Sequence, residues 1–472
     1  MFDPVIAPSG TLLGLLQRGR GDGTLHALTA PRAEALAALN QCVLHDPRHD
    51  WQVENRSLYY ARLFLDLNGE LDALEAHLFD PEDVLDTDES RTGLALAVLG
   101  HLASYGRRDA LTLLRRYAAT GSNWAWALDE LALRDDDAGL RSLAAPVLAR
   151  FPTDAEGEAE LAAAVRDAFE PRPWRLWAED PRESIATRVR AAHETGCFDR
   201  WQRQMRPTGP RPGWSVRAVF EWAQQGFERG AALHVPAARC LVAVAGPEDR
   251  PEILRAAREG ADGARCTALR YLADGDDPEA LDLIEAAVSD GSVTVVEAAV
   301  GAFERMRGAV AVDRARRWAG RPDALGAAAG RMLACRGGTR DRELVLAALR
   351  EAVRGESPDA PALCTLVDGV GRLRITCAAP ILRHVYRETA SSHLRGRAAR
   401  ALAATDPSFA AGFAVECLWD CEESTRELAA RHAETGDTRV VERLRRLAAD
   451  PAEEAEVQTA VRSRIGPDTP AA

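Results

Sequence analysis

The sequence predicts an all-α protein, an α-solenoid of roughly 11–12 stacked antiparallel helix pairs in two halves with an irregular joint. Three observations predict it. Of the 472 residues, 46% are apolar but only 6% are aromatic, and runs of strand-forming residues are few. An arginine–alanine motif recurs at a fixed spacing, and short turns containing Asp and Pro separate stretches of helical periodicity. We expect N-terminal repeats over 1–170, the joint over 171–235, C-terminal repeats over 236–465 and a disordered tail over 466–472.

The N-terminal part opens without a targeting signal. Asp3 stands where a signal peptide carries positive charge, and the apolar stretch Leu12–Leu16 is short and contains Gly14. No apolar run approaches the ~20 residues that span a bilayer. We therefore expect a cytoplasmic protein that does not contact a membrane.

Two tryptophans stand close together in the N-terminal repeats, in the segment Gly121-Ser-Asn-Trp124-Ala-Trp126. Ser122 or Asn123 is suited to cap a helix whose first turn carries both rings. Packing on the preceding helix pair is one interpretation of these rings. If either ring is exposed, Trp124 and Trp126 are candidates for a binding groove.

The joint contains half of the ten tryptophans, between positions 174 and 222. The segment from Arg206 to Trp214 has three Pro and two Gly, which excludes a helix there. One interpretation is that the rings fill an irregular core between two solenoid halves. The other is a binding loop with Arg206, Arg211 and Trp214, because Trp and Arg are frequent hot spots of interfaces.

The C-terminal repeats carry the motif most clearly. The spacing Arg-x-x-Ala-x-Arg begins at 265, 331, 395 and 426, so the copies start at multiples of about 31 to 33 residues. An aspartate follows three of the copies. The residues of this pattern are Arg265, Ala268, Arg270 and Asp276; Arg331, Ala334 and Arg336; Arg395, Ala398, Arg400 and Asp406; and Arg426, Ala429, Arg431 and Asp437. Alanine permits close approach of stacked helices, and one helix pair alone cannot bury its apolar face.

This unit of arginine helix, Asp-Pro turn and second helix resembles the HEAT repeat, in the short form also called the PBS-lyase HEAT-like repeat. The resemblance is clearest over 260–450, weaker over 40–170 and poor over 170–235. It implies an α-solenoid with a ladder of side chains between successive repeats. In that ladder Asp276, Asp406 and Asp437 would cap second helices, and Arg270, Arg400 and Arg431 would bridge repeats.

Charge is unevenly distributed along the chain, which has a net charge of −13. Residues 251–300 hold 11 acidic residues and 4 Arg, whereas residues 301–400 hold 10 acidic residues and 19 Arg. One interpretation is a basic patch formed by Arg314, Arg317, Arg342 and Arg350 on one face of the solenoid, which would attract an acidic partner. The alternative is that these arginines pair with carboxylates of adjacent repeats.

Chemistry-bearing motifs are scarce. The sequence contains no Lys, which excludes Schiff-base chemistry and a phosphate-loop lysine, and the abundance of Arg suggests a GC-rich bacterial genome. The nine Cys form no C-x-x-C pair and are interpreted as reduced core thiols. The segment from Cys42 to Asp50 has residue types that suit zinc, but Pro47 bends it and no second ligand cluster is evident. We expect no catalytic residues, metal or cofactor.

These patterns favour a non-catalytic scaffold that binds an extended protein or peptide, with an acidic segment, on a concave solenoid face. The alternative is a nucleic-acid-binding or enzymatic HEAT protein. Families with HEAT-like repeats, which this sequence resembles, include DNA glycosylases, lyases that attach bilins to phycobiliproteins, and metal-dependent hydroxylases. The glycosylases need Trp and Asp beside a basic patch, and the hydroxylases need repeated His-Glu pairs. This chain separates its Trp and Arg clusters by several repeats and has a single pair, His193-Glu194.

Overall fold

The computed structural model describes residues 6–48, 54, 56–81, 88–204, 213–355 and 361–465. Over these residues the chain is helical and contains no strand, which confirms the predicted all-α class. The chain divides into two compact units. Unit 1 comprises 1–206, 387–399 and 407–472, and unit 2 comprises 207–386 and 400–406. The division of the chain at 170 and 235 stays a prediction, since the border between units follows Arg206.

The helices of unit 1 come from both ends of the chain. They are α1 (Leu12–Gln17), α2 (Gly21–Thr29), α3 (Arg32–Leu44), α4 (Ser57–Asp66), α5 (Asp72–Leu78), α6 (Glu89–Ser104), α7 (Arg108–Thr120), α8 (Trp124–Arg134), α9 (Asp137–Ser142), α10 (Ala144–Leu148), α11 (Ala155–Asp167), α12 (Arg172–Ala178), α13 (Glu183–Gln204), α26 (Phe413–Cys417), α27 (Glu423–His432), α28 (Thr438–Ala449) and α29 (Ala455–Ile465). Helices α24 (Ala379–Glu388) and α25 (Ser392–Thr405) cross the border between the units.

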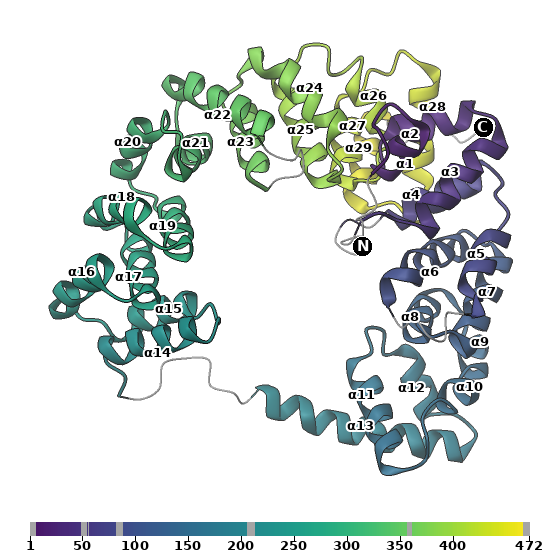
Figure 1. Cartoon of the computed structure of the whole chain (residues 1–472). Coiled ribbons are helices and arrows are strands. Elements are labelled where there is room, and N and C mark those ends of the chain that lie inside the picture. Colours follow the sequence, from purple (N-terminus) through teal and green to yellow (C-terminus); the bar gives the residue numbers. More distant parts are fainter. Residues whose placement is uncertain are drawn as a thin grey trace. The chain divides into compact units, whose positions relative to one another are not determined.

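Unit 2 consists of alternating helices in two rows. It contains α14 (Val216–Glu228), α15 (His234–Val244), η2 (Pro247–Asp249), α16 (Arg250–Glu259), α17 (Asp262–Asp274), α18 (Glu279–Asp290), α19 (Val293–Arg305), α20 (Ala309–Trp318), α21 (Ala324–Arg336), η3 (Thr339–Asp341), α22 (Arg342–Gly355), α23 (Pro361–Arg372) and η4 (Thr376–Ala378). Helices α15, α17, α19, α21 and α23 pack each on the next, and α16, α18, α20 and α22 lie beside them in the other row (Figure 1).

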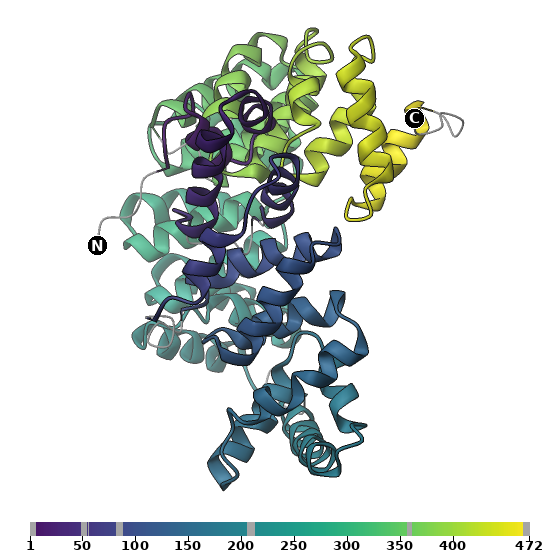
Figure 2. The ribbon, with the colours of Figure 1, turned by 90° about the vertical axis from the view of Figure 1, so that its right-hand side faces the viewer.

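The two ends of the chain pack together in unit 1, where the purple helices α1 and α2 lie beside the yellow C-terminal helices (Figures 1 and 2). The amide of Cys421 donates to the Gly19 carbonyl at 2.9 Å. A Cβ atom on Gly21 would lie 1.9 Å from the Glu416 carbonyl oxygen, so only glycine permits this approach. The joined ends therefore form a tightly packed contact that residues about 400 apart build together.

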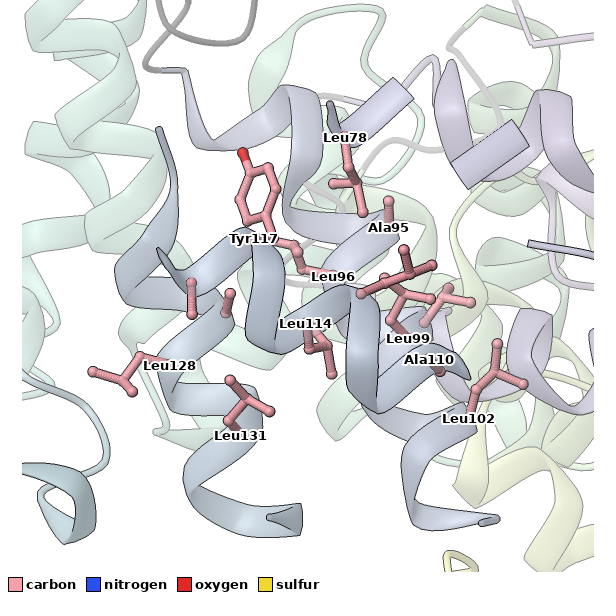
Figure 3. Close-up of a cluster of buried hydrophobic side chains, with 14 of the residues drawn as sticks. Leu78, Ala95, Leu96, Leu99, Leu102, Ala110, Leu114, Tyr117, Leu128 and Leu131 are labelled. Atoms are coloured by element: carbon pink, nitrogen blue, oxygen red, sulfur yellow. The ribbon is translucent and has the colours of Figure 1, made fainter. Parts of the chain in front are cut away.

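The core of unit 1 continues through α5, α6, α7 and α8 (Figure 3). Leu78, Leu99 and Leu131 are fully buried there, as is the ring of Tyr117. Burial of each such side chain contributes roughly 1.5–3 kcal/mol. No helix among the residues described is both long enough and apolar enough to cross a membrane.

Candidate partner-binding groove

The alanines of the repeat motif are buried, and the arginine three residues earlier contacts the neighbouring repeat. Ala334 lies so close to α23 that a Cβ on Gly369 would be 2.4 Å from its own Cβ. Arg331 pairs with Glu304 at 2.5 Å, and Arg395 pairs with Asp420 at 2.7 Å in a fully buried contact. Residues three apart share one helix face, which brings the first arginine of the motif to the buried side.

The expectation that the second arginine bridges repeats is wrong. Arg270 lies 3.7 Å from Asp274 of its own helix, Arg431 pairs with Glu427 of its own helix, and Arg400 is exposed without an ion pair among the residues described. The reason is helical geometry. Two residues beyond the buried alanine, a side chain points about 200° away from it, toward solvent.

The three turn aspartates have three different roles, and only Asp437 caps a second helix. Its side chain accepts from the amide of Arg439 at the start of α28. Asp406 instead pairs with Arg383 at 2.6 Å, and the next helix, α26, has no side-chain cap. Asp276 has a left-handed backbone, φ 52°, and accepts from the amides of Arg307 and Gly308. Asp276 therefore caps no helix of its own repeat. It connects that repeat to the start of α20.

Helices α15, α17 and α19 run in the same direction. The starts of α15 and α17 line one pocket and their ends line another. At the starts of α17 and α19, the Ser292 hydroxyl donates to Asp262 at 2.7 Å across 30 residues. At their ends, Arg305 contacts Asp274 at 2.6 Å across 31 residues. Equivalent positions of successive helices thus face each other, so the free carbonyls at the ends of the row lie on one side of unit 2.

Arginine side chains bind such helix ends repeatedly in this protein. The last four carbonyls of a helix lack helical partners and carry partial negative charge, which a guanidinium satisfies. Arg372, the last residue of α23, donates to the carbonyls of Ala334 and Gly337 at the end of α21, at 2.8 and 2.9 Å. Arg464 binds the end of α27 in the same way. Arg172 and Arg188 bind the ends of α8 and α10.

No arginine among the described residues binds the end of α15, which borders a groove of about 550 Å³. The groove lies between the last turns of α15 and α17 and the start of α16. Its walls are apolar at Val242, Pro247 and Tyr271, and polar at Arg250, Asp274 and Asp277. Val242 has 70% of its surface exposed. An exposed apolar wall beside carboxylates is suited to bind a partner's side chain.

A second groove, of about 720 Å³, lies in unit 1 between the turn after α4 and helix α7. Its charges are already paired. Arg107 contacts Asp109 at 2.5 Å, and Arg116 contacts Glu75 at 2.5 Å while covering the Phe79 ring. The groove at α15 and α17 is the better candidate because it adds the exposed apolar wall of Val242.

The four arginines of the expected basic patch differ in their surroundings. Arg314 contacts Asp282 at 2.7 Å and Glu285 at 3.3 Å and stacks over Trp318, so its charge is compensated within the fold. Arg342 is exposed and donates to the Leu373 carbonyl at 2.9 Å. Arg317 and Arg350 are exposed and have no ion pair among the residues described. These two side chains are the ones available to an acidic partner.

The tryptophans proposed as binding residues pack against other side chains of the fold. Trp124 is half-buried and packs edge-on against Phe151 and Trp174 at 5.7 and 6.4 Å. Trp126 is half-buried against the same core. Trp214 packs on Trp222 at 5.2 Å. These rings pack mainly within the fold, and the two expected loop residues Arg206 and Arg211 lie outside the described residues.

Burial shifts the pKa values of several titratable groups in unit 1. Burial raises the pKa of Glu130 to about 7, although Arg134 at 2.7 Å opposes this, and lowers that of His101 to about 4. Burial also raises the pKa of the Cys42 thiol to about 12, so the thiol is protonated at neutral pH. Among the residues described, no three His, Cys, Asp or Glu side chains are grouped to hold a metal ion.

Comparison of the sequence with protein-family models and with curated proteins finds no match. The class of protein is therefore inferred from its residues and geometry alone.

Proposed function

We propose that this chain is a non-catalytic, HEAT-like repeat scaffold of the bacterial cytoplasm that binds an extended protein partner along the concave face of an α-solenoid. The observation that carries the proposal is the row α15, α17, α19, α21 and α23, whose members pack each on the next. Helices α17, α19 and α21 begin at Asp262, Val293 and Ala324, every 31 residues. Such regular stacking is typical of solenoids, which present long surfaces to extended partners.

Binding is favoured over catalysis because the conspicuous side chains have structural partners. The buried arginines Arg395 and Arg426 contact carboxylates, and Arg372 and Arg464 contact helix ends. An acidic segment of the partner would contact Arg317 and Arg350, whose charges the fold leaves exposed.

The proposal is tested by capturing partners from a native lysate on the tagged full-length protein, with and without nuclease. We expect one protein at a constant ratio to the chain, retained after nuclease treatment. Replacing Arg317 and Arg350 together by Glu is expected to reduce its retention. The matched control is Arg217→Glu with Arg229→Glu, two exposed arginines at α14, which should have no effect. Partners that disappear with nuclease would contradict the proposal and favour nucleic-acid binding.

A further inference from the structure

We propose that the groove between α15 and α17 binds an arginine of the partner protein, flanked by an aliphatic residue. The guanidinium would donate to the free carbonyls at the end of α15 and face Asp274, while the aliphatic side chain contacts Val242, Pro247 and Tyr271. This inference rests on the proposed function for the existence of a protein partner, and it specifies the chemistry of one contact.

The first support is the set of open carbonyls at the end of α15. The amide of Gly246, which would normally donate to the Val242 carbonyl, donates to Asp249 at 2.9 Å instead. Pro247 has no amide hydrogen to offer the Ala243 carbonyl. No described residue donates to the carbonyls of Val242, Ala243 and Val244. Three acceptors at the negative end of a helix dipole thus remain open to an external donor.

The second support comes from the same position elsewhere in the row. Helix α23 ends in Arg372, which binds the end of the preceding helix α21. Helix α17 ends instead in Asp274, whose carboxylate contacts Arg305 of α19 and Arg270 of its own helix, so the last residue of α17 supplies no guanidinium to the end of α15. The chain itself therefore shows which chemical group fits the end of a row helix, and α15 is left without that group.

The third observation concerns charge. Arg250 pairs with Asp277 and Glu279 at 2.8 and 2.9 Å, and Asp274 contacts Arg305 at 2.6 Å and Arg270 at 3.7 Å. The carboxylates of the lining are thus compensated within the fold. The acceptors left open to an arginine are the helix-end carbonyls, which carry partial negative charge.

The test is a selection of displayed random dodecapeptides on the full-length protein, with counter-selection on the variant Asp274→Arg. This variant places at the end of α17 the guanidinium that α23 carries as Arg372. We expect selected peptides to be enriched in Arg next to Leu, Ile or Val. Synthetic copies should bind the variant at least ten-fold more weakly, and Arg→Gln copies should lose affinity for the wild-type chain to the same extent.

Two further variants keep the result interpretable. Val242→Ser removes an exposed apolar wall with little effect on folding, and should weaken binding of the selected peptides at least three-fold. Glu343→Arg makes the same charge change at the exposed start of α22, and should stay within two-fold of wild type. Circular dichroism checks that each variant is folded.

The inference is overturned if the selection enriches no arginine, or if Asp274→Arg and Val242→Ser bind the selected peptides as wild type does. Concentration-dependent self-association abolished by Asp274→Arg would also overturn it, because the occupant would then be a second copy of the chain. If the peptide test fails but the lysate partner is still retained, only the arginine-binding inference is contradicted and the scaffold proposal stands. If no protein is captured from the lysate, the scaffold proposal itself is contradicted.

Discussion

Replacing Glu453 by Ala is expected to destabilise unit 1 by about 3–5 kcal/mol, because it breaks the buried ion pair with Arg426 and removes the contact with Arg62 near the other end of the chain. The Glu453 side chain is fully buried. It accepts two hydrogen bonds from Arg426, at 2.7 and 3.0 Å, and contacts Arg62 of α4 at 3.1 Å. After the substitution the Arg426 guanidinium, 3% exposed, retains only carbonyl partners. An uncompensated buried charge is much more costly than a lost surface contact.

The assay is equilibrium unfolding in urea, followed by circular dichroism and tryptophan fluorescence. The control is Glu351→Ala, which breaks an ion pair with Arg354 whose partners are 71% and 79% exposed. That control should cost no more than about 1 kcal/mol. The double variant Arg426→Met with Glu453→Leu should be more stable than Glu453→Ala, because it removes both charges. A loss below about 1 kcal/mol for Glu453→Ala would refute the reasoning.

The pH dependence of this difference gives a second check. Burial alone would raise the pKa of Glu453, but the hydrogen bonds and charge of Arg426, with the charge of Arg62, hold it below its ordinary value of 4.5. A carboxylate with a lowered pKa stabilises the folded state above 4.5, and this stabilisation is lost as the pH falls through the folded pKa. The difference between wild type and variant should therefore be constant near neutral pH and shrink only below about 4.5.

Three other substitutions test separate parts of the structure. Asp406→Ala should lower stability by about 2 kcal/mol through the lost pair with Arg383, rather than through a lost helix cap, and the thermal midpoint measures it. Ala334→Leu should cost about 1–3 kcal/mol in urea unfolding by overpacking the contact with α23, whereas Ala327→Leu on the exposed side of the same helix should be nearly neutral. Because burial raises the pKa of Glu130 to about 7, its ionisation opposes folding as the pH rises from 4.5 through 7, so Glu130→Gln should exceed wild type in stability at pH 8 but not at pH 5.

The sequence was informative wherever the relevant signal is local. Helical periodicity and the Arg-x-x-Ala spacing predicted an all-helical chain, and the alanines of the motif, such as Ala268 and Ala398, are buried. The same periodicity also indicates that the first arginine of the motif, and not the second, bridges repeats. Arg395 shares a face with Ala398, whereas Arg400 does not, and applying the helical angle to the motif would have identified it.

The packing of the chain ends was not predictable in this way. The contact between Gly19 and Cys421 joins residues about 400 apart, and no pattern within either segment indicates the other.

The groove between α15 and α17 was predictable only in part. Asp274 at the end of α17 differs from Arg372 at the end of α23 in the sequence itself, but the difference becomes informative only when the helix bounds and the free carbonyls of α15 are known.

Hydrogen–deuterium exchange of the full-length chain, with and without the captured protein partner, tests the central claim most directly. An extended partner on a helical-repeat scaffold should slow exchange over several consecutive helices of one row, such as α18, α20 and α22, because Arg317 and Arg350 lie on α20 and α22. Slowed exchange confined to a single short segment, or no change in that row, would contradict the scaffold proposed here.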